Sequence, residues 1–341
     1  MLSFWLAAGL GASAVVAAAQ QPPAAAPSAP PQAPAAAPVQ LTVTQLRPNI
    51  YEIEGGGGNS TVIVGSVGVI VVDAKTTEAA GRQLVAEVAK ITPKPITTLI
   101  ETHSDGDHVN GVAGFPMPLT IIAHEGNRKE QQAALAAGGR GAPPPGRLPT
   151  QVVSGQKETV TIAGVKLELY HWGPAHTSGD LVVYVPDRKL VATGDIIVTN
   201  RSEDNPNIHA EKNGSTAGWI ANAKGMALLD ADTYVTGHGT LLTKADLQAR
   251  AKRIEDRRAK IEAMVKQGKT LDEIKTALPE AAAPTPTAAP ATAAAPAPPG
   301  AAPGPQPATA PGGPAAGAGR GGGGAPAPSF TELAYQELTK K

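Results

Sequence analysis

The stretch Thr102-His-Ser-Asp-Gly-Asp-His-Val-Asn-Gly111 decides the fold of this 341-residue chain. Within six residues it holds four side chains that can bind a metal ion, namely His103, Asp105, Asp107 and His108. The stretch directly follows residues 96–101, an apolar run that is typical of a buried strand. Burying two unpaired carboxylates so close together would cost several kcal/mol, so the group either binds a cation or forms a solvated acidic turn.

Three further candidate ligands favour the cation. Each follows an expected strand and lies beside glycine: His176 in Gly-Pro-Ala-His-Thr, Asp195 in Thr-Gly-Asp, and His238 in Gly-His-Gly. The ends of strands in a rigid sheet can hold side chains out to one shared site. A single histidine after a strand is usually a capping or solvated residue. Four such motifs in this order instead predict one shared metal centre.

The order His-x-Asp-x-Asp-His, Gly-Pro-Ala-His-Thr, Thr-Gly-Asp and Gly-His-Gly resembles the metallo-β-lactamase superfamily over residues 41–278. The resemblance implies an α/β (α+β) fold, a four-layer αβ/βα sandwich with the metals at one edge between the sheets. It also implies two metal sites. The first site would use His103, Asp105 and His176, and the second would use Asp107, His108 and His238. Asp195 would bridge the two ions. Asp107 would in addition act in catalysis by orienting the attacking water or moving its proton.

Asp105 departs from the family pattern, in which a second histidine usually stands at this place. A carboxylate is a harder donor than imidazole. The expected cofactor is therefore two divalent metal ions, zinc in the first place, with iron or manganese as options and a first site that can be partly filled. An acidic residue here is also similar to the flavodiiron oxygen reductases, whose flavin domain is missing from these 341 residues.

The expected function is that of a metallo-hydrolase acting on a small-molecule substrate. Two metal ions lower the pKa of bound water toward neutrality, and hydroxide can then attack an ester, lactone, lactam, thioester or phosphoester. The sequence does not choose among these substrates, and β-lactamase activity is one option. The alternatives are a diiron redox protein, suggested by Asp105, and a non-catalytic metal-binding protein of the cell envelope, suggested by the Pro-rich flanks.

Composition excludes several other classes. The chain has no cysteine, which rules out disulfides, thiolate nucleophiles and cysteine-bound metals. Lys plus Arg equals Asp plus Glu at 29 each, so no net charge favours nucleic acid. The run Gly55–Gly58 lacks the Lys-Ser/Thr of a phosphate loop and predicts a tight hairpin close to the site.

The ends of the chain are expected to lie outside the domain at 41–278. Residues 1–19 have the pattern of a signal peptide, so we expect a secreted or periplasmic protein without stable membrane insertion after cleavage; an uncleaved anchor and a misplaced start are the alternatives. Residues 20–40 form an Ala/Pro-rich linker and 279–328 a disordered Ala/Pro/Gly-rich segment. Residues 329–341 predict a helix, capped by Ser329, that docks on the domain, with a fraying terminus as the alternative. The oligomeric state is open.

The remaining histidines and two loops receive lesser roles. His124 and His171 are candidates for supporting hydrogen bonds near the site, and His209 is expected on the surface. Loops 138–149 and 200–214 are expected to form the walls of the substrate pocket.

Overall fold

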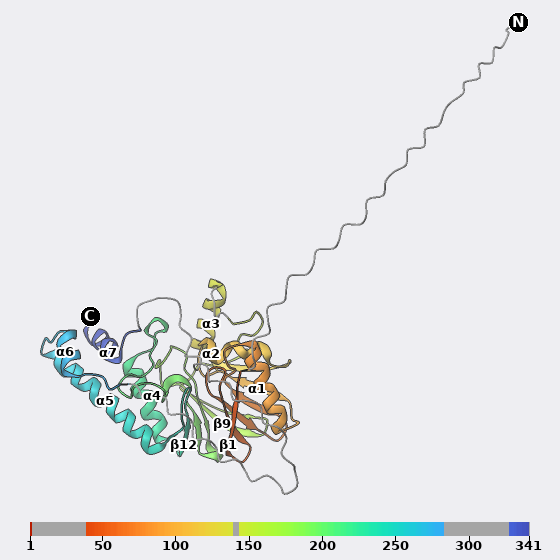
Figure 1. Cartoon of the computed structure of the whole chain (residues 1–341), viewed down its shortest axis with the longest axis horizontal. Helices are drawn as coiled ribbons and strands as arrows, with labels where there is room; N and C mark the ends of the chain where they lie inside the picture. Colours follow the sequence, from red (N-terminus) through yellow and green to blue (C-terminus); the bar gives the residue numbers. More distant parts are fainter. Residues whose placement is uncertain (2–38, 139–142, 283–326, 341) are drawn as a thin grey trace, which may run out of the picture. The chain divides into compact units, whose positions relative to one another are not determined.

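The computed structural model describes residues 1, 39–138, 143–282 and 327–340 (Figure 1). The predicted signal peptide and linker, and most of the segment 279–328, therefore lie outside the described residues. Everything below concerns the compact unit Pro38–Lys341. The helices of its described residues include no candidate for a membrane span.

The first sheet has seven strands in the order β1-β2-β3-β4-β5-β6-β7. Their bounds are β1 Thr42–Arg47, β2 Ile50–Glu54, β3 Ser60–Val64, β4 Val69–Val72, β5 Ile96–Ile100, β6 Thr120–His124 and β7 Gln151–Val153. Strands β1 to β4 pair antiparallel, and β4 to β7 pair parallel. Strand β4 consists of four apolar residues that are all buried, as a strand covered on both faces requires.

The second sheet has six strands in the order β13-β12-β11-β10-β9-β8. Their bounds are β8 Lys157–Ile162, β9 Val165–Tyr170, β10 Val182–Val185, β11 Leu190–Ala192, β12 Thr233–Val235 and β13 Leu242–Thr243. Only β11 and β12 pair parallel in this sheet as described. In β9 the alternate residues Leu167 and Leu169 are fully buried, so one face of this strand points into a core.

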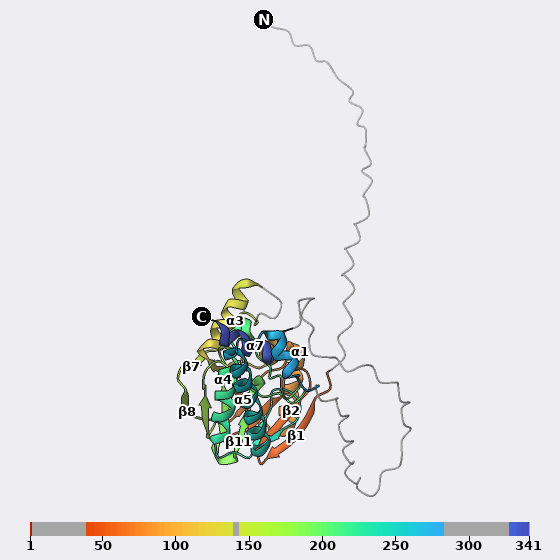
Figure 2. The same cartoon turned by 90° about the vertical axis from the view of Figure 1, so that its left-hand side faces the viewer.

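Two sheets and their helices form four layers (Figures 1 and 2). The central core holds apolar side chains of both sheets, among them Ile70 and Val183. A second core joins the first sheet to helix α1 (Glu78–Ile91) through Leu84 and Val88. A third joins the second sheet to helices α4 (Thr216–Leu228) and α5 (Lys244–Lys266). The fold is therefore the αβ/βα sandwich that the sequence predicts.

Shorter helices connect these layers. Their bounds are α2 Gly106–Val109, η1 Asn110–Gly114, α3 Glu125–Ala137, η2 Pro186–Arg188, η3 Gly194–Ile196, η4 Ala210–Lys212 and α6 Leu271–Ala277. Residues 106–109, expected as part of an irregular loop, instead form the helical turn α2. The sequence analysis also did not predict the short elements β7, β13 and α6.

The last helix, α7 (Phe330–Thr339), packs against α4, α5 and α6. Phe330 is fully buried and Leu333 nearly so, whereas Leu338 is only partly buried. Ser329 and Glu332 form a capping box at its first turn. Contacts also continue past residue 278, the expected end of the domain, because the Ala281 amide donates to Asp204 at 2.8 Å.

Candidate metal centre

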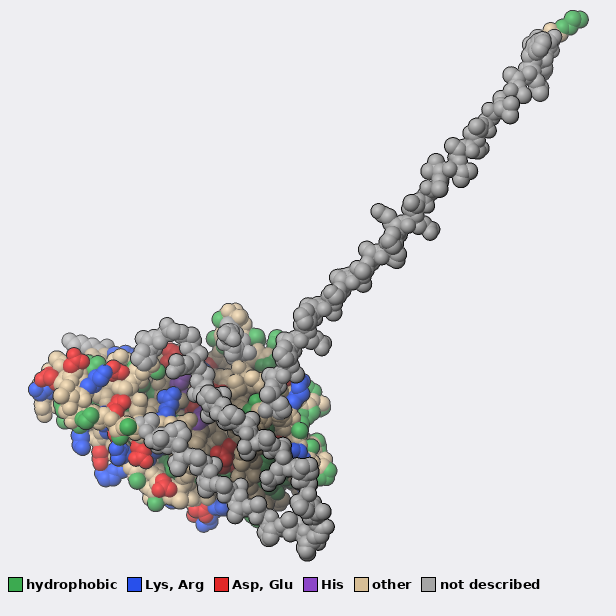
Figure 3. Space-filling model, viewed as in Figure 1, with side chains coloured by type: hydrophobic (Ala, Val, Ile, Leu, Met, Phe, Trp, Pro, Cys, Tyr) green, Lys and Arg blue, Asp and Glu red, His purple; other side chains and the backbone are tan. Residues whose placement is uncertain are grey.

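The structure brings the predicted ligands into two adjoining groups. Within each group the donor atoms all lie within 4.8 Å of one another. The groups are His103, Asp105 and His176, and Asp107, His108 and His238. The first group follows β5 and β9, and the second lies on α2 and after β12, so strand ends of both sheets meet here. On one face of the molecule histidine side chains reach the surface among acidic ones (Figure 3).

Asp195 lies between the two groups. Its Oδ1 is 3.2 Å from Nε2 of His108 and 3.5 Å from Nε2 of His238. Its Oδ2 is 3.9 Å from Nε2 of His176 in the other group. Asp195 is thus placed where a carboxylate can contact two ions at once, as the family resemblance implies.

The shortest contacts inside each group join a histidine to a carboxylate. His176 Nε2 is 3.1 Å from Asp105 Oδ2, and His238 Nε2 is 3.1 Å from Asp107 Oδ2. The Nε2 atoms of His108 and His238 are only 3.3 Å apart. Two imidazole nitrogens at that distance need either a proton or a metal ion between them or beside them.

Asp73, which the sequence analysis did not single out, orients two of these imidazoles. It stands directly after β4 and is buried. Its Oδ2 accepts from Nδ1 of His108 at 2.8 Å and from the Thr102 hydroxyl at 2.8 Å. That hydroxyl in turn accepts from Nδ1 of His103 at 2.9 Å. Both rings therefore keep their Nε2 lone pairs for the centre, which is how carboxylates typically set the tautomer of metal-binding histidines.

The loop 200–214 holds His176 and borders the centre. The Asn207 carbonyl accepts from Nδ1 of His176 at 3.0 Å, and the Asn207 side chain donates to Asp195 Oδ2 at 3.1 Å. Lys212 forms a short ion pair with Asp105 Oδ1. His209, expected on the surface, is partly exposed and contacts the exposed Glu211 at 2.7 Å. Its Nε2 also lies 3.8 Å from Asp105, because the loop folds back over the first group.

The donor set fits a cation. His103 Nε2 and Asp195 Oδ1 are buried and make no hydrogen bond within the described residues. Leaving such atoms unsatisfied costs about 1–3 kcal/mol each, which a bound metal ion would offset. The donors are imidazole nitrogens and carboxylate oxygens, the ligands of zinc, iron and manganese sites without cysteine.

Burial and neighbouring charges separate the protonation states of the histidines. Burial, reinforced by His108 and His176, holds the pKa of His103 well below its usual value, so this imidazole is neutral and able to bind metal. Burial also opposes charge on His108, but the carboxylates of Asp195 and Asp73 outweigh it and raise its pKa well above the usual value. A metal ion at this place would replace the His108 proton.

Glycine is required where the hairpin 55–58 passes the centre. A Cβ on Gly58 would lie 2.1 Å from Cε1 of His108. The Gly58 amide donates to the Asp107 carbonyl at 3.0 Å, and the buried Lys75 ammonium donates to the Gly58 carbonyl at 2.7 Å. The predicted close approach of this hairpin to the site is confirmed.

The other predicted supporting residues lie farther out. His124 caps α3 by accepting from the Gly126 amide at 3.2 Å and stacks on His171 with the ring centres 3.7 Å apart. His171 Nδ1 contacts the Asp180 carbonyl at 2.7 Å, and the Asp180 carboxylate holds the turn around His176. Glu130 on α3, not singled out from the sequence, accepts from Ser104 and Ser178 and so ties the His103 loop to the His176 loop.

Of the two expected pocket walls, loop 200–214 borders the centre. In loop 138–149, residues 139–142 lie outside the described residues. Arg147 of that loop contacts Phe115 and Met117 instead. All seven predicted ligands meet in one cluster, and which of them bind metal stays a prediction.

Comparison with known proteins agrees with this geometry. A family model described as the metallo-β-lactamase superfamily matches residues 53–238. The α subunit of 2,4-dinitroanisole O-demethylase from Nocardioides sp. is 30% identical over 61% of this chain and 61% of its own length. A linear primary-alkylsulfatase from Pseudomonas sp. is 24% identical over 50% of this chain and 39% of its own length.

The chain thus spans less than two thirds of both of these curated relatives. A stereoselective inverting sec-alkylsulfatase of known structure, also from Pseudomonas sp., shares the fold with a TM-score of 0.57 at 18% identity, over 70% of this chain and 45% of that one. Because the family model covers more than half of the chain and ends at His238, the last predicted ligand, the chain belongs to the metallo-β-lactamase superfamily.

Proposed function

We propose that this protein is a metal-dependent hydrolase that cleaves an ester-type bond in a small molecule. The observation that carries the proposal is the junction of two ligand groups at Asp195, whose oxygens face His108 and His238 on one side and His176 on the other. Metal ions bound there supply an activated water and polarise the bond under attack.

Asp107 is the residue best placed to handle the proton of the attacking water. Its side chain is 40% exposed, whereas the side chain of Asp195 is 5% exposed. Burial would raise the pKa of Asp107, but a hydrogen bond from His238 outweighs it and lowers the pKa to about 2. Asp107 is therefore ionised at neutral pH and can accept a hydrogen bond from water.

The relatives support a C–O or sulfate ester bond as the target. Their names describe an O-demethylase and an alkylsulfatase, and both are similar in sequence to this chain. Lys212 and His209 lie at the edge of the first group, where a cationic side chain can contact a leaving oxygen or a sulfate oxygen. Lactams, thioesters and phosphoesters complete the set of substrates to be tested.

The test combines metal analysis with hydrolysis of a substrate panel by the full chain. Protein purified without chelator is expected to carry one to two transition ions per chain. It should hydrolyse at least one of p-nitrophenyl acetate, p-nitrophenyl sulfate, p-nitroanisole, nitrocefin, bis-p-nitrophenyl phosphate and a chromogenic thioester. Asp107→Asn should lower kcat by a factor of about 100 or more, while Asp187→Asn, at an exposed turn, should not change it.

Two results would overturn the proposal. Iron at two per chain without any hydrolysis would favour the diiron redox alternative. Protein that neither contains metal nor takes it up on titration would contradict both the hydrolase and the non-catalytic metal-binding alternative.

A further inference from the structure

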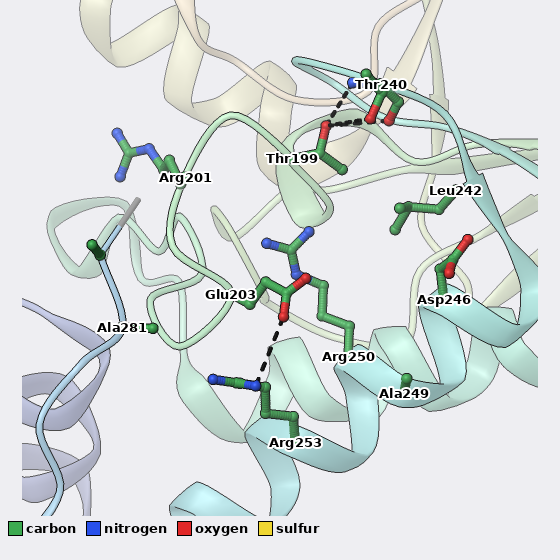
Figure 4. A pocket seen from close by; sticks show the side chains of 11 residues that line it. Thr199, Arg201, Glu203, Thr240, Leu242, Asp246, Ala249, Arg250, Arg253 and Ala281 are labelled. Carbon is green, nitrogen blue, oxygen red and sulfur yellow. Dashed lines mark hydrogen bonds and ion pairs between the residues drawn. The ribbon is translucent and has the colours of Figure 1, made fainter. Parts of the chain in front are cut away.

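A cleft of about 570 Å³ opens beside the metal centre, and none of the seven predicted ligands lines it. Its walls are the loop after η3, the first half of α5 and residues 281–282 (Figure 4). Three arginines line it, namely Arg201, Arg250 and Arg253, together with the carboxylates Glu203 and Asp246. The proposed hydrolysis does not use any of these side chains.

Arg250 is the unusual member of this group. It is only 8% exposed, yet within the described residues it makes no hydrogen bond and no ion pair. Burial accordingly lowers the pKa of its guanidinium. The undescribed segments 2–38, 139–142 and 283–326 contain no Asp or Glu, so no side-chain carboxylate in them can be its partner. None of its nitrogens is among the buried unpaired polar atoms of the described residues, so the stem of Arg250 is buried while its guanidinium faces the cleft, where it can donate to an anion.

Two neighbouring arginines on α5 have hydrogen-bond partners for their guanidinium groups. Arg253 Nε donates to Asp204 at 2.6 Å and Nη1 lies 3.8 Å from Glu203. Arg257 donates to the Leu278 carbonyl at 2.6 Å and to the Thr331 hydroxyl at 2.9 Å. Of these three groups, Arg250 alone has no hydrogen bond or ion pair to another described residue.

The two carboxylates of the cleft are already engaged. Asp246 accepts from the Thr243 amide at 3.0 Å and from its hydroxyl at 2.6 Å in the capping box of α5. Glu203 lies beside Arg253 rather than within ion-pair distance of Arg250. Within the described residues, therefore, neither lining carboxylate forms an ion pair with Arg250.

We propose that this cleft binds the anionic group of a small molecule, a carboxylate, sulfate or phosphate monoester, and that Arg250 is its main contact. The planar guanidinium can donate two parallel hydrogen bonds to such a group. The volume leaves room for a molecule larger than the inorganic anion. The cleft adjoins the loop of His238, since the Thr199 amide donates to the His238 carbonyl at 2.9 Å and the Thr240 amide donates to Thr199 Oγ1 at 2.6 Å. The inference does not depend on hydrolysis.

Titration of the metal-loaded full chain with inorganic sulfate tests the proposal by calorimetry and by thermal melting. Wild-type protein is expected to bind sulfate and to melt at a higher temperature in its presence. Arg250→Gln should bind about 10- to 100-fold more weakly, and Arg250→Lys should fall between the two. The matched control is Arg82→Gln, an exposed arginine on α1 at the other side of the fold, which should bind as the wild type does.

Sulfate binding to the metal ions themselves would remain in Arg250→Gln. The proposal therefore concerns only the sulfate binding that the wild type shows and Arg250→Gln has lost. Equal sulfate affinity in wild type, Arg250→Gln and Arg250→Lys would overturn the proposal. If Arg250→Gln fails to fold, Arg201→Gln, at an exposed arginine of the same cleft, replaces it. The proposal would then be overturned if both Arg201→Gln and Arg250→Lys bind sulfate with the affinity of the wild type. A crystal soaked in selenate should show the anion beside Arg250, and selenate at the metal centre alone would contradict the assignment.

Discussion

Asp73 is a single carboxylate whose position determines how two imidazoles face the metal centre. It receives one hydrogen bond from His108 directly and another through the Thr102 hydroxyl, which holds His103. The backbone at Asp73 has a φ of 65°, a left-handed conformation that Asp adopts more readily than most residues. The end of β4 is therefore shaped to place this carboxylate behind the ligands.

The first prediction concerns this residue. Asp73→Asn replaces an acceptor of two hydrogen bonds with a side chain that also carries donors, so His108 and His103 lose their fixed orientation. Affinity for zinc should fall roughly 10- to 100-fold, measured by competition with a chromogenic chelator. Asp187→Asn serves as the control. An unchanged affinity for zinc would mean that the ligands hold their orientation without Asp73.

The second prediction concerns Asp105 and its ion pair with Lys212. Asp105→His restores the commoner ligand and removes the partner of Lys212, so zinc affinity of the first group should rise, because imidazole is the softer donor. Asp105→Ala should lose about one ion per chain from that group and retain the ion at Asp107, His108 and His238. Elemental analysis of the dialysed variants gives both results. Unchanged stoichiometry in Asp105→Ala would show that Asp105 is not a ligand.

The sequence predicted the cluster of seven side chains but not the residues around it. Histidines and aspartates in short Gly-containing motifs carry a recognisable spacing, and all seven meet in space. Asp73, Asn207 and Lys212 are isolated polar residues at the end of a strand or within a long loop. The roles of Asn207 and Lys212 depend on where the backbone of loop 200–214 folds, and the role of Asp73 depends on how the end of β4 meets β5 and α2; no local period or spacing encodes these arrangements.

At the scale of elements, periodicity identified the long segments and failed for the short ones. Helices α1 and α5 and the strands of four or more residues show clear patterns. Strands β7 and β13 have three and two residues and cannot display alternation. Helix α6 carries a signal that the prediction did not use, since Thr270 and Glu273 form a capping box at its start.

The third prediction addresses helix α7. Phe330 is completely buried in the core shared with α4 and α5, so Phe330→Ala should lower the free energy of unfolding by about 3–5 kcal/mol. Gln336→Ala, on the exposed side of the same helix, should change it by less than about 0.5 kcal/mol. Urea unfolding followed by circular dichroism measures both. Equal stability of the two variants would show that α7 contributes little to the core.

At the scale of the whole molecule, the pH dependence of stability involves a buried carboxyl group that is not one of the predicted ligands. Glu52 on β2 is 4% exposed and its Oε1 makes no hydrogen bond within the described residues. Burial, together with the nearby Glu54 carboxylate, raises the pKa of Glu52 from 4.5 to about 7. The folded protein therefore holds a proton on Glu52 at pH values where the unfolded chain has released it.

The fourth prediction follows from that shift. The stability that protonated Glu52 gives is fully present below about pH 4.5 and is lost as the pH rises through about 7. Relative to Glu52→Gln, the wild type should lose up to ~1.4 kcal/mol of unfolding free energy per pH unit within this window. Burial lowers the pKa of Lys75 to about 7, so Lys75 contributes to the pH dependence of the unfolding free energy only above that window.

Urea unfolding of both proteins at several pH values between 4.5 and 8 measures the difference. Glu78→Gln, which changes an exposed carboxylate on α1, should follow the wild type. A difference between wild type and Glu52→Gln that does not vary with pH would contradict the shifted pKa.

The two ends of the undescribed segment 283–326 are fixed at neighbouring residues of one loop. The Ala281 amide donates to Asp204 and the Phe330 amide donates to Asn205, each at 2.8 Å. The cost of closing a loop grows only with the logarithm of its length, so doubling the segment would cost about 0.6 kcal/mol. In genetic terms, we expect insertions and deletions between these two anchors to be close to neutral for the fold, with the helix beyond them keeping its place.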